Sequence, residues 1–160
     1  MIRTYAIVLI SVFSLFGYYI YKHAFAQYIT ETEFSEELEI NDNLYAAQVS
    51  LWRDFMPTTM KKEQTLKAAV HLILEMNSEA TAPKLNLKKL YLINEENDII
   101  WQTSLKQTST MSSEYGIEGK AYDGPKLEED THVRTVVSFK IDGGETHYLT
   151  YKDAVVGFIY

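Results

Sequence analysis

Hydrophobic and polar residues alternate along much of the chain after residue 44, a pattern that is typical of half-buried β-strands. In TLKAAVHLILEM, every second residue from 66 to 76 is apolar, whereas Lys67, His71 and Glu75 fall on the other face. Leucine, alanine and methionine also favour helices, so a helix is the alternative interpretation. Because the alternation is sustained over the whole segment, it predicts one long strand.

Two further pairs of segments predict β-hairpins. LNLKKLYLIN and DIIWQTSL flank the polar residues 95–97, and Ile99 and Trp101 are expected to face the core. HVRTVVSFKI and THYLTYKDAVVGFIY flank the DGGE stretch at 142–145, where aspartate and glycine supply the positive φ angles of a tight turn. The pattern also predicts a break in the last strand at 152–153.

The connection between these hairpins, residues 105–130, is polar and rich in glycine, so a long loop with one weak strand at 117–122 is expected. A further strand at 45–53 brings the number to about seven, with turns spaced as in a sandwich. We therefore predict a mainly β protein: an immunoglobulin-like antiparallel β-sandwich of about seven strands behind an N-terminal hydrophobic helix. The chain has no cysteine, so the disulfide of antibody domains cannot form.

The first 26 residues contain an uncharged run from Thr4 to Tyr21 that follows a basic residue. Ala24-Phe25-Ala26 matches a signal-peptide cleavage site, which makes 1–26 a signal peptide. The alternative is a retained signal anchor, because the run approaches the length that crosses a bilayer. Membrane anchoring through residues 4–21 thus stays open. Both interpretations predict an extracytoplasmic protein that is periplasmic, secreted or anchored to the membrane.

Residues 27–43 contain six acidic and no basic side chains, and we interpret them as an acidic spacer with a short helix at 33–38. The β-sandwich domain is then expected at 44–160. The net charge of the chain is −7, and after residue 26 there are 22 acidic but only 13 basic side chains. A domain this acidic repels a phosphate backbone, so no nucleic-acid partner is expected.

Candidate catalytic groups are few. The absence of cysteine excludes thiolate nucleophiles, and His71, His132 and His147 are far apart in sequence without a metal-binding motif. No serine lies in a hydrolase motif. The acidic segments 94–98 and 127–131 offer oxygen ligands for Ca²⁺, although neither has the spacing of a calcium loop. We therefore predict a non-enzymatic protein without a cofactor.

The segment SLWRDFMPTT at 50–59 stands out because it combines residue types that are common in binding surfaces. If 45–53 is a strand, Val49, Leu51 and Arg53 share one face. Pro57 has no backbone N–H to donate, so the strand must end near it or lie at an edge.

Two interpretations of this segment are open. In one, Trp52 and Phe55 close the end of the sandwich, and Arg53 pairs with Asp54 or another nearby acid. In the other, Trp52, Arg53 and Met56 form an exposed patch that anchors a partner.

The segments LWRDFMP, DIIWQTSL and GPKLEED also resemble a loosely defined family of small uncharacterised exported proteins that share a W-R-D-F-M-P segment. In this chain, Gln102 and Leu127 depart from that pattern. The resemblance supplies no activity, but it implies one domain with a β fold, and its shared segments mark either one site or determinants of folding. The candidate binding residues are Trp52, Arg53, Asp54, Phe55, Met56, Pro57, Trp101, Gly124, Pro125 and Lys126.

The sequence thus predicts an interaction protein of the cell envelope whose partner is another envelope or secreted protein. Two alternatives are kept. An immunoglobulin-like protease inhibitor would use the 105–130 loop and the DFMPTT corner at 54–59. A calcium-dependent carbohydrate-binding module would use the two acidic segments.

Overall fold

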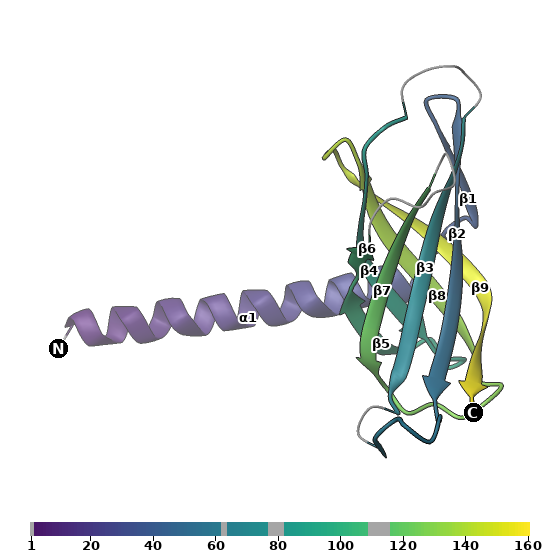
Figure 1. Ribbon diagram of the computed structural model, residues 1–160. Helices are drawn as coiled ribbons and strands as arrows, with labels where there is room; N and C mark the ends of the chain where they lie inside the picture. Colours follow the sequence, from purple (N-terminus) through teal and green to yellow (C-terminus); the bar gives the residue numbers. More distant parts are fainter. Residues whose placement is uncertain (1, 62–63, 77–81, 109–115) are drawn as a thin grey trace. The chain divides into compact units, whose positions relative to one another are not determined.

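The computed structural model describes residues 2–61, 64–76, 82–108 and 116–160, with residues 2–16 as backbone alone. The chain consists of two compact units, Met1–Glu33 and Phe34–Tyr160. The first unit contains helix α1 (Ile2–Glu31) (Figure 1). The expected N-terminal helix is therefore present and includes the first residues of the expected spacer. Within the described residues, no helix combines the length and apolarity needed to cross a bilayer.

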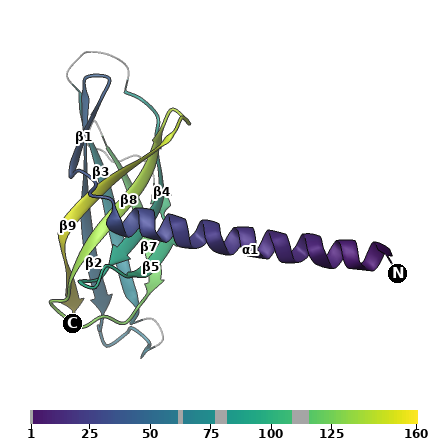
Figure 2. The ribbon, with the colours of Figure 1, turned by 180° about the vertical axis from the view of Figure 1, so that it is seen from behind.

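The second unit consists of β-strands, which Figures 1 and 2 show from opposite sides. The strands are β1 (Glu37–Ile40), β2 (Asn43–Asp54), β3 (Leu66–Met76), β4 (Leu85–Ile93), β5 (Ile99–Ser104), β6 (Lys106–Thr108), β7 (Gly116–Gly124), β8 (His132–Ile141) and β9 (Thr146–Ile159). The described part thus contains nine strands, more than the seven or so expected, because β1 and the short β6 were not anticipated.

The strand order is that of an immunoglobulin-like sandwich. One sheet has the order β2-β3-β7-β6 and the other has β9-β8-β4-β5. These orders match strands ABED and GFCC′ of immunoglobulin domains when β2 is taken as strand A. β9 joins the sheets: it pairs with β8 up to Val155, and its last residues, Val156–Ile159, then pair in parallel with Leu51–Asp54 of β2.

The alternation along β2 and β3 determines which side chains enter the core. In β3, the even-numbered positions from Leu66 to Leu74 are buried, and Ala69 is the one odd-numbered position buried with them. The strand predicted from this segment is therefore confirmed, and the helix is excluded. In β2, the odd-numbered positions from Tyr45 to Arg53 are buried, as expected for the face that carries Arg53.

Both predicted hairpins are present. β4 pairs with β5, and β8 pairs with β9. In the second turn, Asp142 and Gly143 have φ angles of 48° and 76°, and Gly144 N donates to Ile141 O at 2.8 Å. Positive φ at both central residues is the turn geometry that matches the twist of two paired strands. In the first hairpin, a bulge between Leu92 and Ile93 shifts the register.

The strand expected at 117–122 is confirmed as part of β7, but the segment 105–130 is less loop-like than expected, because β7 is longer and the short strand β6 also lies within it. β7 was underestimated because glycine occupies positions where an apolar side chain would signal a strand. A Cβ on Gly119 would come within 2.9 Å of Leu87 Cδ1 and 3.1 Å of Leu105 Cβ. A larger residue here would have to displace the side chains of Leu87 and Leu105 across the core, so the packing favours glycine. Residues 109–115 of the expected loop lie outside the described residues.

Three smaller expectations also need correction. No helix forms at 33–38; instead β1 pairs with Asn43–Ala46 of β2, so the β unit begins at Phe34 and the spacer is largely part of it. The expected break at 152–153 is a change of register inside one continuous β9. Ile99 and Trp101 were expected to face the core. Trp101 does pack against the core, but Ile99 does not, and its neighbour Ile100 does so instead.

Candidate functional site

The sandwich has two ends, which the strand registers define. We call one the apolar end: it contains the β2–β3 connection (55–61 and 64–65), the β4–β5 turn (94–98), the β7–β8 connection (125–131) and the last residues of β9. The opposite, polar end contains the turns at 41–42 and 142–145 and residues 82–84. All ten candidate binding residues lie at or near the apolar end.

Arg53 is the central side chain of the apolar end. It is the last core-facing residue of β2 and is only 8% exposed. Its Nε donates to the backbone carbonyl of Gln64 at 3.0 Å, and its Nη1 donates to that of Leu127 at 2.6 Å. The guanidinium lies 4.7 Å from the ring centre of Phe55 and 5.1 Å from that of Phe158. Arg53 therefore joins β2, the start of β3, the β7–β8 connection and β9.

This geometry corrects one prediction for Arg53. Among the described residues, Arg53 forms no ion pair with Asp54 or with another nearby acid. Its guanidinium is instead stabilised by hydrogen bonds to two carbonyl oxygens and by cation–π contacts with two aromatic rings. Arg53 is thus a structural cation with two fixed hydrogen bonds, rather than a side chain presented on the surface.

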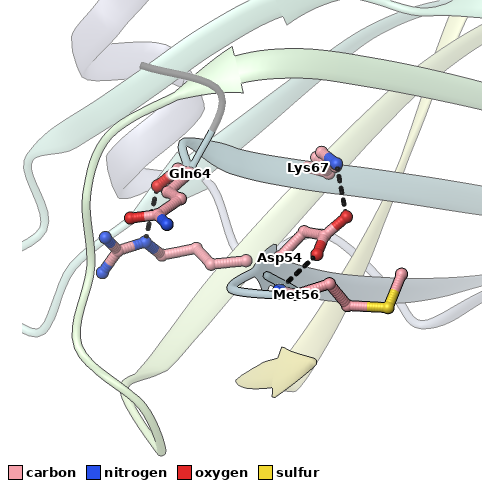
Figure 3. A network of polar contacts seen from close by, with 5 residues as sticks. Asp54, Met56, Gln64 and Lys67 are labelled. Carbon is pink, nitrogen blue, oxygen red and sulfur yellow. Dashed lines mark hydrogen bonds and ion pairs between the residues drawn. The ribbon is translucent and has the colours of Figure 1, made fainter. Parts of the chain in front are cut away.

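Asp54 points to the other face of β2, away from the core. Its carboxylate accepts a hydrogen bond from the backbone N–H of Met56 at 3.0 Å and forms an ion pair with Lys67 at 3.3 Å (Figure 3). The Met56 N–H, followed by the contacts of Thr59 and Lys67, lowers the pKa of Asp54. These bonds shape the corner where the chain leaves the sheet ahead of Pro57.

The glycine of the GPK segment is part of the same end. Gly124 is buried at the end of β7, and a Cβ placed on it would lie 2.9 Å from Leu66 Cβ and 3.0 Å from the ring of Trp101. The ring of Trp101 therefore packs against a site where only glycine fits. Pro125 is half-buried and Lys126 is exposed, as the chain turns toward Leu127.

The apolar end also exposes large hydrophobic side chains. Within the described part of the β unit, every exposed large hydrophobic residue lies here. They are Met56, Met60, Tyr122, Val155, Ile159 and Tyr160. Met60 is 55% and Tyr160 is 76% exposed. Of the candidate residues, only Met56 belongs to this set, whereas Trp52 is half-buried.

The C-terminal residues were missed by sequence reasoning. Phe158 and Tyr160 form an aromatic group with Phe55, whose ring centre is 4.6 Å from that of Phe158 and 6.1 Å from that of Tyr160. The hydroxyl group of Tyr160 also donates a hydrogen bond to the carboxylate of Glu129, with 3.1 Å between the two oxygens, and this bond raises the pKa of Tyr160. One signal could have indicated them. The segment AVVGFIY at 154–160 contains more apolar residues than a strand with only one buried face requires.

A cavity of about 480 Å³, open to solvent, lies at the apolar end and is lined by residues of the β4–β5 turn and of the β7–β8 connection, among others. It is lined by both acidic segments that were considered for Ca²⁺, with Glu95 and Glu96 from one and Asp130 from the other. Within the part of the chain that the structure describes, no three histidine or acidic side chains lie close enough to share a metal ion. His132 lines the same cavity, whereas His147 packs on Phe139 toward the polar end.

Comparison with known proteins gives no significant match: no family model, no curated protein and no solved structure is similar to the chain. The resemblance to proteins with a W-R-D-F-M-P segment therefore stays a prediction.

Proposed function

We propose that this protein is an exported, non-enzymatic interaction module that binds another envelope or secreted protein through its apolar end. The observation that carries the proposal is the distribution of exposed apolar side chains, which gather at one end of an otherwise polar sandwich. Exposed apolar groups that cluster in this way are typical of partner sites. Methionine and tyrosine are also enriched at protein interfaces.

The surroundings of these side chains favour a preformed site. Arg53 and the aromatic group of Phe55, Phe158 and Tyr160 connect segments that are far apart in the sequence. A surface held by such contacts loses little conformational entropy when a partner binds. The exposed side chains of Met56 and Ile159 flank this rigid base and supply the contact area.

Export is supported by the uncharged run at 4–21 and the Ala-Phe-Ala sequence that follows it. A cleaved signal peptide and a retained anchor both deliver residues 34–160 to the same compartment. Fractionation of producing cells, with determination of the mature N-terminus, tests this part. Recovery of the β unit in the cytoplasm would refute export.

The partner site is tested by crosslinked affinity capture with the full chain and two variants. The apolar-end variant carries Met56→Ser, Met60→Ser and Ile159→Ser, which are exposed and not needed for the core. The control variant carries Asp42→Asn and Glu145→Gln, two exposed changes at the polar end.

We expect one partner to be captured by the original chain and the control variant, and lost from the apolar-end variant. All three proteins must show the same melting temperature for the comparison to hold. The proposal would be overturned if the apolar-end variant captured the same partner as the original chain, or if the original chain captured no partner. Crosslinks only between copies of this chain would make the apolar end a dimer interface instead.

A further inference from the structure

The open cavity at the apolar end has two chemically different parts. Ile100, Leu127 and Val133 line it with apolar groups, and Val133 is buried. Glu95, Glu96 and Asp130 line it with carboxylates, and all three residues are exposed. An apolar surface beside several carboxylates is the environment that a long cationic side chain requires, because its methylene stem and its charged head need different surroundings.

The carboxylates of the cavity are not neutralised within the described residues. None of the ion pairs there involves Glu95, Glu96 or Asp130. His132 is the one basic side chain that lines this cavity, and Arg134 and Lys152 line a smaller adjacent hollow together with Glu95. The lining of this cavity, with three carboxylates and one histidine, therefore carries excess negative charge, whereas the two cations lie in the adjacent hollow.

The cavity is continuous with the proposed partner surface. Asp130 N donates to Val156 O at 2.9 Å, and Val156 N donates to Thr131 O at 3.0 Å, which fixes the acidic segment to β9. The adjacent Glu129 accepts the hydrogen bond of Tyr160. A partner that covers Tyr160 would thus reach the cavity with a neighbouring side chain.

We infer that the cavity receives a lysine or arginine side chain of the partner protein, so that the partner presents a basic residue beside apolar ones. The inference rests on the proposed function and specifies the chemistry of its partner. A volume of about 480 Å³ that is open to solvent leaves room for one such side chain to enter from a bound partner. The same charge disfavours an anionic membrane surface as the occupant.

The test uses small probes, so that it does not depend on knowing the partner. The full chain, with isoleucine, leucine and valine methyl groups labelled and kept in a neutral detergent, is titrated with N-acetylargininamide and followed by NMR. N-Acetylnorleucinamide, which has an uncharged apolar side chain, is the control probe. Two variants with the same charge change are compared: Glu95→Gln/Asp130→Asn at the cavity and Asp42→Asn/Glu145→Gln at the polar end.

We expect the arginine probe to shift the methyl signals of Ile100, Leu127 and Val133 with saturation at millimolar concentration. The cavity variant should weaken this binding about threefold or more, and the polar-end variant should leave it unchanged, since only near charges act through solvent. Equal shifts with the norleucine probe, equal weakening in both variants, or no localised shift would overturn the inference. Because the probe assay does not use the partner, it can fail while capture through Met56, Met60 and Ile159 succeeds.

Discussion

The two ends of the sandwich are held together in different ways. At the polar end the backbone sets the structure: Asp142 and Gly143 adopt positive φ angles, and the Asp142 carboxylate accepts a hydrogen bond from Lys84 N at 2.8 Å. At the apolar end side chains dominate, with Arg53 against two adjacent aromatic rings and Trp101 against Gly124. A local turn can close one end of a sandwich, whereas a rigid surface with exposed apolar groups requires contacts between distant segments.

The largest effect should come from Arg53→Ala. The substitution leaves the carbonyl oxygens of Gln64 and Leu127 without their donor and removes the cation that lies against the rings of Phe55 and Phe158. A hydrogen bond to a charged group contributes about 1.5–3 kcal/mol, so we expect the free energy of unfolding to fall by about 3 kcal/mol. Denaturant titration measures this loss of unfolding free energy, and Lys61→Ala, a substitution of an exposed residue, serves as the control. A loss as small as that of the control would mean that Arg53 does not hold this end together.

Gly124→Ala should have the next largest effect. The new methyl group would meet Leu66 Cβ at 2.9 Å and the Trp101 ring at 3.0 Å, and neither is the free end of a flexible chain. Overpacking of this kind typically costs about 1–3 kcal/mol, and we expect a loss of about 2 kcal/mol. Gly157→Ala is the matched control, because its nearest neighbour, Leu51 O, is 3.8 Å away. The close packing would be disproved by equal stability of the two variants.

Gly143→Ala tests the polar end, where the cost should arise from the backbone alone. An added Cβ meets nothing within 4 Å, but φ is 76°. The left-handed conformation costs an L-residue about 1–2 kcal/mol, and we expect a loss of about 1 kcal/mol. Gly143→Asn should be less destabilising, because asparagine tolerates this region. If alanine and asparagine cost the same, side-chain contacts rather than the φ angle determine stability here.

The smallest effect concerns Asp54, through its pH dependence. Its pKa is lowered in the folded protein, so its contribution to stability is present above the unfolded value of about 3.9 and is lost as the pH falls through the folded value. Asp54→Asn should therefore lower the melting temperature slightly at pH 7, and the difference from the original chain should shrink as the pH falls below the unfolded pKa of Asp54. A difference that persists at low pH would mean that the charge of Asp54 is irrelevant.

The sequence was sufficient where structure follows from local alternation or turn chemistry. β3 and the hairpin at 142–145 could be predicted because every second residue, or each turn residue, carries the signal. β7 was predicted only as a weak, shorter strand, because glycine at 119 and 124 stands where apolar side chains would have strengthened the pattern. The sequence therefore predicted the sandwich, but it predicted about seven strands where the described residues form nine.

The candidate site was predicted in position but not in its chemistry. The W-R-D-F-M-P and G-P-K segments do meet at one end of the sandwich. The partners of Arg53 are carbonyl groups, one of them 74 positions away, and every residue supplies a carbonyl group. No residue type therefore marks these partners in advance. The position of Tyr160 beside Phe55 likewise depends on the parallel pairing of β9 with β2, which no local pattern indicates.

Site-specific photocrosslinking in the producing cells tests most directly whether the apolar end is the partner surface. A benzophenone amino acid replaces Tyr160 at the apolar end in one protein and Glu145 at the polar end in another. Both positions are exposed, so both probes report contact with a partner. We predict one discrete crosslinked protein from position 160 and none from position 145. A discrete adduct from position 145, with none from position 160, would contradict the proposed partner surface.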